Sequence, residues 1–268
     1  MMQIQDLINE IVVNVDSILL FEPNKDSYNL YKDITNTVTI AKENEFDKEQ
    51  FIELPIDFQD TTELVRFGIT GALDQGFVEE NTAAICVTNL FNSDADSITR
   101  VSVDGNNESE FYDFFAFSRA EASVIGETLK LAISLGKQGQ KGEPVGALFS
   151  IGDAGTVMSS SRSLSYNPFD QSHVRVGDSI MKVMLKEFSR LDGAFVISDA
   201  GKIVSAYQYL EPIIEDLNIP KGLGTRHHAA AAITNETDAV TIVLSESDSR
   251  VRGFKNGDLI FNIDPEMY

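Results

Sequence analysis

The stretch Gly222-Leu-Gly-Thr-Arg-His-His-Ala-Ala-Ala231 constrains this chain more than any other part of its sequence. Its two glycines let the backbone make a tight turn, and Thr225 is suited to cap the alanine-rich helix that follows. Arg226, His227 and His228 would then occupy the first helical turn, where unpaired backbone amides and the helix dipole favour an anion. The pattern predicts a phosphate-binding turn. The alternative is a capped core helix whose basic residues are simply exposed.

The overall charge limits what such a turn can bind. The chain of 268 residues carries a formal net charge of −21, which repels nucleic acids and anionic membranes. A phosphate ligand therefore needs a local site and a metal ion. No apolar run approaches the roughly 20 residues that span a bilayer, and the N-terminus lacks the layout of a signal peptide. Cys86 is the single cysteine, so we expect a cytoplasmic protein with no disulfide framework and no membrane or nucleic-acid partner.

The first hundred residues alternate between helical and strand patterns. The predicted elements are a helix over residues 3–20, a strand over 36–41, a helix over 61–76, and strands over 83–88 and 97–103. These lengths indicate a small α/β layer domain over residues 1–105, with a polar linker at 104–110. The carboxylates of this part are scattered and form no catalytic constellation, so a structural or assembly role is its default interpretation.

The second half predicts a mixed β-sheet flanked by helices. Its predicted elements are a helical pattern over 110–136 that restarts near Ser118, a strand over 144–151, a polar loop at 159–163, a turn at 167–169, a helix over 179–190, a hairpin of strands 191–198 and 202–207, and strands over 240–244, 250–254 and 259–263. The helix over 179–190 is amphipathic, with Ile180, Val183, Met184 and Phe188 on one face. Nothing in this half repeats, so a single second domain is expected.

Three polar clusters fall where predicted strands or helices begin or end. They are Asp192-Gly193-Ala194, Thr225-Arg226-His227-His228 and Ser245-Glu246. Ligand sites in α/β folds gather at such positions. Asp192 could merely end the preceding helix, but the small residues after it leave room for a flat ligand near the backbone. Together the clusters supply a carboxylate, a set of phosphate-binding groups and a second carboxylate.

The order and spacing of these clusters resemble the diadenylate cyclase (DAC) domain. That family is marked by an Asp-Gly-Ala motif and by an Arg-His-Arg motif preceded by Gly-Thr. Leu210-Glu-Pro212 matches the Leu-x-Pro element between them, and Asn167-Pro-Phe169 also fits. The resemblance covers about residues 119–265 and places a DAC domain at 119–268. More weakly, the first hundred residues resemble the C-terminal domain of pyruvate kinase, a pairing found in archaeal diadenylate cyclases.

Two positions depart from the family pattern. His228 stands where the basic motif has its second arginine, and histidine lacks the planar two-pronged geometry of a guanidinium. Ser247 replaces the second acid of a Ser-Glu-Glu motif. A metal role at that position would therefore pass to Glu246 or Asp192.

The resemblance implies that two ATP molecules condense into cyclic di-AMP with release of two pyrophosphates. The reaction would take place where two DAC domains of a homo-oligomer meet face to face, with Mg²⁺ or Mn²⁺ bound. The implied catalytic residues are Asp192, Arg226 and His227, and the implied metal ligands are Asp192 and Glu246. The implied ATP-binding residues are Gly193, Ala194, Leu210, Gly224, Thr225, Arg226, His227, His228, Ser245 and Glu246. One alternative is a catalytically weak or inactive sensor of ATP or cyclic di-AMP, and another is a structural module that binds no nucleotide.

Overall fold

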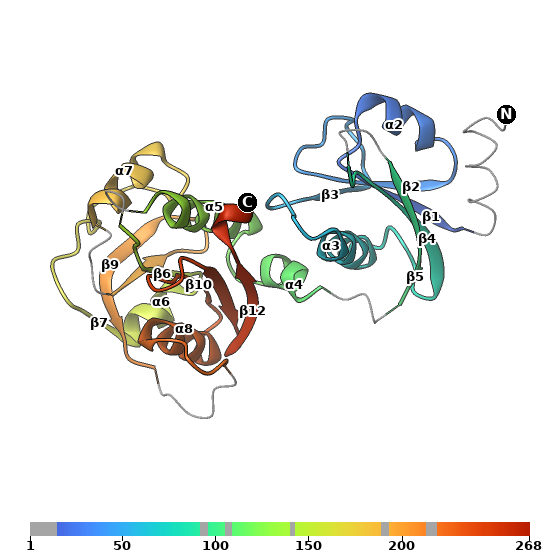
Figure 1. The fold of residues 1–268 in the computed structure, drawn as a ribbon. Helices are drawn as coiled ribbons and strands as arrows, with labels where there is room; N and C mark the ends of the chain where they lie inside the picture. The colour runs from blue at the N-terminus through green and yellow to red at the C-terminus, as the bar shows by residue number, and fades with distance from the viewer. Residues whose placement is uncertain (1–14, 92–95, 105–108, 140–142, 189–192, 213–218) are drawn as a thin grey trace. The chain divides into compact units, whose positions relative to one another are not determined.

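The computed structural model describes residues 15–91, 96–104, 109–139, 143–188, 193–212 and 219–268 (Figure 1). The chain divides into two compact units, Met1–Tyr112 and Asp113–Tyr268. The helices within the described ranges are all too short or too polar to cross a bilayer.

The N-terminal unit is built on a five-stranded sheet with the strand order β3-β2-β1-β4-β5. Four strands are parallel, and β5 pairs antiparallel with β4 at one edge. The elements are β1 (Ser17–Phe21), α2 (Lys25–Tyr31), β2 (Asn36–Ala41), β3 (Phe51–Glu53), α3 (Thr61–Asp74), β4 (Thr82–Thr88) and β5 (Ser97–Val103). Helix α4 (Glu110–Ala116) contains the boundary between the two units. This arrangement confirms the predicted α/β layer domain, including the strands at 36–41, 83–88 and 97–103.

The predicted helix over residues 3–20 is wrong at its C-terminal end. Ser17–Phe21 forms strand β1, which lies between β2 and β4 and is buried along its whole length. A continuous apolar run of this kind satisfies a central parallel strand as well as a helix, and the sheet decides the outcome. The rest of the predicted helix, residues 3–14, lies outside the described residues, as do residues 105–108 of the predicted linker.

The C-terminal unit contains a seven-stranded mixed sheet with the order β12-β11-β10-β6-β8-β9-β7. Figure 1 shows α5 on one face of this sheet and α6 and α8 on the other. The elements are α5 (Ala122–Gln138), β6 (Ala147–Ile151), α6 (Ala154–Ser159), β7 (Ser161–Ser163), α7 (Ser179–Phe188), β8 (Ala194–Ile197), β9 (Ile203–Leu210), α8 (Thr225–Glu236), β10 (Val240–Leu244), β11 (Val251–Lys255), β12 (Asp258–Ile263) and the 3₁₀ turn η2 (Pro265–Met267). The predicted mixed sheet flanked by helices is confirmed.

Two local predictions in this unit are wrong. The expected polar loop at 159–163 contains strand β7, whose residues pair antiparallel with β9 at the edge of the sheet. Polar strands occur at such edges because one side of the ladder faces solvent. Helix α7 buries Met181 and Leu185, whereas Ile180 and Val183 are exposed, so the predicted apolar face is rotated. The side chain of Phe188 lies outside the described residues.

An irregularity in the β8–β9 hairpin shapes the entry to strand β8. The pairing register shifts between Ala194 and Val196. Beside this shift, Gly193 has φ +110° and Tyr207 has φ +60°. A Cβ on Gly193 would lie only 2.9 Å from the backbone carbon of Tyr207 and 3.0 Å from the backbone nitrogen of Gln208. Both its conformation and this close backbone approach therefore require glycine at position 193.

Candidate active site

Helix α8 begins at the predicted anion-binding turn, but its cap differs from the prediction. The capping position is Gly224, in extended conformation, and no side chain bonds to the helix start. Because glycine has no side chain, that absence concerns the capping residue itself. Thr225 is the first helical residue, and its expected role as the N-cap is wrong. Arg226 and His227 follow in the first turn, as predicted. The amides of His227 and His228 donate to the carbonyl oxygen of Gly224 at 3.0 Å and 3.3 Å. The helix dipole and the amides of Thr225 and Arg226 therefore remain for a ligand.

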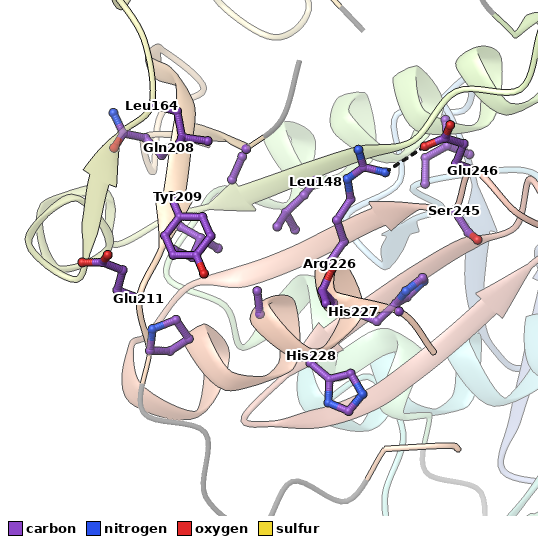
Figure 2. Close-up of a pocket in the computed structure, with 18 of the residues that line it drawn as sticks. Leu148, Leu164, Gln208, Tyr209, Glu211, Arg226, His227, His228, Ser245 and Glu246 are labelled. Atoms are coloured by element: carbon purple, nitrogen blue, oxygen red, sulfur yellow. Dashed lines mark hydrogen bonds and ion pairs between the residues drawn. The ribbon is translucent and has the colours of Figure 1, made fainter. Parts of the chain in front are cut away.

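The start of α8 opens into a cavity of about 1190 Å³ (Figure 2). Every residue that the sequence predicted to bind ATP lines this cavity: Gly193, Ala194, Leu210, Gly224, Thr225, Arg226, His227, His228, Ser245 and Glu246. The strands explain this convergence, because Gly193 precedes β8, Leu210 ends β9 and Ser245 follows β10. Asp192 lies outside the described residues, immediately before Gly193.

The side chain of Arg226 extends from helix α8 toward Glu246 (Figure 2). Its Nη1 lies 3.4 Å from Oε2 of Glu246, the pair joined by a dashed line in Figure 2. The side chain of Arg226 is 31% exposed and that of Glu246 is 64% exposed. An ion pair with this much solvent access is weak, so an anionic ligand can compete with Glu246 for the guanidinium. His228 extends from the helix in a different direction (Figure 2).

His227 differs from Arg226 because it is buried. Its Nε2 lies 3.4 Å from Nη1 of Arg252, and Arg252 forms a two-pronged ion pair with Asp248 at 3.2 Å and 2.6 Å. Since a guanidinium only donates hydrogen bonds, Nε2 must be the acceptor and Nδ1 carries the proton. Burial, and next the charge of Arg252, lower the pKa of His227 to about 4. The hydrogen bonds from Arg252 hold the pKa of the Asp248 carboxyl well below its usual range.

This burial corrects one part of the electrostatic prediction. The sequence places a guanidinium and two imidazoles at the helix start, but the imidazole of His227 is neutral at pH 7. Its Nδ1 is buried without a hydrogen-bond partner in the described part of the chain. His227 therefore brings no positive charge to a ligand at the start of the helix.

The pKa of His227 makes the stability of the protein pH-dependent. The unfolded state takes up a proton near pH 6.5, whereas the folded state resists it until about pH 4. The stabilisation that comes from this difference in the pKa of His227 is therefore fully present above pH 6.5. It is lost as the pH falls toward 4, which lowers the free energy of unfolding by up to about 3 kcal/mol. Urea unfolding should show that the free energy of unfolding falls more steeply between pH 7 and pH 4 for the wild type than for His227→Gln. The glutamine amide is neutral throughout this range.

His173, which is exposed in the same domain, provides the control for that experiment. His173→Gln should leave the steep pH dependence in place. Equal slopes for the wild type and His227→Gln would contradict a neutral, buried His227.

Sequence reasoning missed several side chains of the cavity. The guanidinium of Arg162 lies 4.8 Å from the ring centre of Tyr209, and its Nε donates to Glu211 at 2.6 Å. All three residues line the cavity. Tyr209 and Glu211 flank Leu210 in the Leu-x-Pro element, which is the signal that could have found them. Arg162 carried no such signal, because its strand was predicted to be a loop.

The described residues contain no group of three or more His, Cys, Asp or Glu side chains placed to hold a metal ion. Glu246 supplies one carboxylate at the cavity, and Ser247 contributes only a hydroxyl, which lies 3.1 Å from the hydroxyl of Ser245. Protein sites for Mg²⁺ in phosphoryl transfer commonly use one or two carboxylates together with substrate phosphates. This sparse donor set fits such a shared site.

Comparisons with known proteins agree with the motifs. Residues 1–123 match the family model "Diadenylate cyclase, N-terminal", and residues 135–259 match "DisA bacterial checkpoint controller nucleotide-binding". A diadenylate cyclase from Haloferax volcanii is 55% identical over 100% of both chains. One from Methanocaldococcus jannaschii is 36% identical over 86% of this chain and 76% of its own.

Among solved structures, DacA from Staphylococcus aureus aligns with 54% of this chain and 89% of its own, with a TM-score of 0.40 and 24% identity. The two relatives and the two family models, rather than this structural likeness, decide the assignment. They confirm the resemblance predicted from the motifs, including its archaeal form with an extra N-terminal domain. The chain belongs to the diadenylate cyclase family.

Proposed function

We propose that this protein condenses two ATP molecules into cyclic di-AMP in the cavity at the start of α8. The observation that carries the proposal is the convergence, in one cavity of about 1190 Å³, of every described residue predicted to bind ATP. The adenine lies by Gly193 and Leu210, and the phosphates lie by Arg226 and the first-turn amides of α8. The domain at 119–268 performs the reaction, while that at 1–105 serves assembly or regulation.

Each of the two bonds forms by the same step. The 3′-oxygen of one ATP attacks the α-phosphorus of the other, the bond to the bridging oxygen breaks, and pyrophosphate leaves. Asp192 orients the 3′-hydroxyl and accepts its proton. The guanidinium of Arg226 and the backbone amides of Thr225 and Arg226 stabilise the charge on the phosphates, whereas the neutral, buried His227 adds no charge there. Positioning and charge stabilisation supply most of the acceleration in such transfers.

Mg²⁺ or Mn²⁺ would be held by Glu246, Asp192 and the phosphates of ATP. Bound there, the cation would supply positive charge, since Arg226 is already shared with Glu246, Arg162 is shared with Glu211 and His227 is neutral. This expectation follows from charge, because two guanidiniums that are each paired with a carboxylate do not neutralise a triphosphate.

The test is incubation of the purified protein with ATP and either cation, followed by separation of the products by chromatography and mass spectrometry. Cyclic di-AMP and pyrophosphate in a ratio of one to two are expected, and removal of the cation by EDTA should stop their formation. ATP that is bound but returned unchanged under both cations would overturn the proposal in favour of a nucleotide sensor. Absence of any ATP binding would leave only a structural module.

We propose that each cavity binds one ATP and that two copies of the chain bring their cavities together face to face for the reaction. The specific activity should therefore fall as the protein is diluted, while the ATP bound per chain stays constant. Initial rates measured alongside sedimentation at the same protein concentrations provide the check. A specific activity that persists in a monomeric protein would contradict the face-to-face site.

A further inference from the structure

The guanidinium of Arg226 lies against the backbone of Gly146, a buried residue immediately before strand β6. A Cβ placed on Gly146 would lie 3.0 Å from Cζ of Arg226 and closer still to its Nη1. It would also lie 3.2 Å from Cβ of Glu246. A side chain at position 146 and the guanidinium in its present position therefore exclude each other.

The backbone of Gly146 does not explain why glycine stands there. Its φ lies outside the left-handed region that favours glycine, so any L-residue could adopt this conformation. The short contacts of its missing Cβ are made by side-chain atoms of the Arg226–Glu246 pair. The space above Gly146 is thus occupied by a side chain that the proposed function uses.

We propose that Gly146 is a positioning residue for ATP binding, an inference that rests on the proposed phosphate-binding role of Arg226. The absence of a side chain at 146 forms a slot for the guanidinium, and Glu246 contacts it at 3.4 Å (Figure 2). The slot keeps the planar group at the start of α8, where the dipole and amides of the helix also attract phosphate. Gly146 itself does not touch the substrate.

The first experiment measures ATP binding to Gly146→Ala by calorimetry. The methyl group displaces the flexible end of the Arg226 side chain and presses on Cβ of Glu246 at 3.2 Å, a contact that a shift of a few tenths of an ångström relieves. The thermal unfolding midpoint should therefore stay close to that of the wild type. The dissociation constant for ATP should rise by about tenfold, as expected when a charge-assisted hydrogen bond is lost. An unchanged dissociation constant would overturn the proposal.

Gly155→Ala supplies the matched control. Gly155 lies in α6 of the same domain, and a Cβ at this position would meet no atom within 4 Å. The same chemical change should therefore leave ATP binding unaltered.

A double-mutant cycle separates an effect through Arg226 from a general disturbance of the cavity. In an Arg226→Ala background, the added methyl group has no guanidinium to displace, so Gly146→Ala should cause no further loss of affinity. A penalty of the same size with and without Arg226 would overturn the proposal. Because ATP binding is measured without turnover, a protein that binds ATP but makes no cyclic di-AMP would refute the proposed function and leave this inference standing.

Discussion

Replacing Asp192 with asparagine is expected to abolish cyclic di-AMP synthesis while leaving ATP binding nearly intact. Asparagine keeps the size of the side chain but does not accept the proton of the ribose 3′-hydroxyl. Loss of a general base typically lowers a rate by about a hundredfold to ten-thousandfold. The turnover rate and the ATP dissociation constant, measured on the same preparation, test this separation.

Asp258, exposed at the start of β12, provides the control for the charge change, and Asp258→Asn should retain wild-type turnover. Wild-type turnover by Asp192→Asn would remove this carboxylate from the mechanism. A variant that loses ATP binding together with activity would assign Asp192 to substrate binding instead.

Replacing Arg226 with alanine should weaken ATP binding and slow turnover together. Its guanidinium lines the cavity and is held there by a weak ion pair, so its hydrogen bonds to phosphate act in both the bound and the transition state. Losing a hydrogen bond to a charged group costs about 1.5–3 kcal/mol, which is roughly ten- to a hundredfold in affinity. Steady-state kinetics and ATP calorimetry give the two quantities.

Arg226→Lys keeps the charge but loses the planar group, so it should fall between the wild type and Arg226→Ala. Arg175, an exposed arginine outside the lining of the cavity, serves as the control. If Arg226→Ala shows unchanged kinetics, the glycine-rich turn is only the start of a helix.

The sequence predicted the second sheet well because most of its strands are marked by apolar runs. Ala147–Ile151 and Val240–Leu244 are wholly buried and neighbour each other at the centre of the sheet. The polar clusters meet because the residues after β10 and those before β8 lie near the start of the same helix, α8. Once the strands are placed, the motif residues of the cavity come together, whereas Arg162 and Tyr209 are not marked by any motif.

The surroundings of His227 could not be predicted in this way. Its pKa depends on burial and on Arg252, which reaches it from β11. A sequence motif identifies the histidine but contains no information about which side chain will cover it. The slot at Gly146 could not be predicted from the sequence either, since a glycine before a strand has many ordinary explanations.

The prediction for the residues of strand β1 was wrong for a different reason. Its apolar residues continue a spacing that also suits a helix, and only the pairing of Ser17–Phe21 with β2 and β4 decides between the two. A local sequence pattern does not predict pairing between strands that are distant in the chain.

The order of strands in the second sheet has a consequence for how the protein is made. Its central strand β6 pairs with β8 on one side and with β10 on the other, and the β10 pairing joins Ile151 to Val240. A ribosome must therefore synthesise almost the whole chain before β6 finds its second neighbour, whereas the first sheet is complete by Val103. Pairings between distant segments form slowly. A nascent or truncated chain that ends before β10 would thus carry a finished first domain and no cyclase cavity.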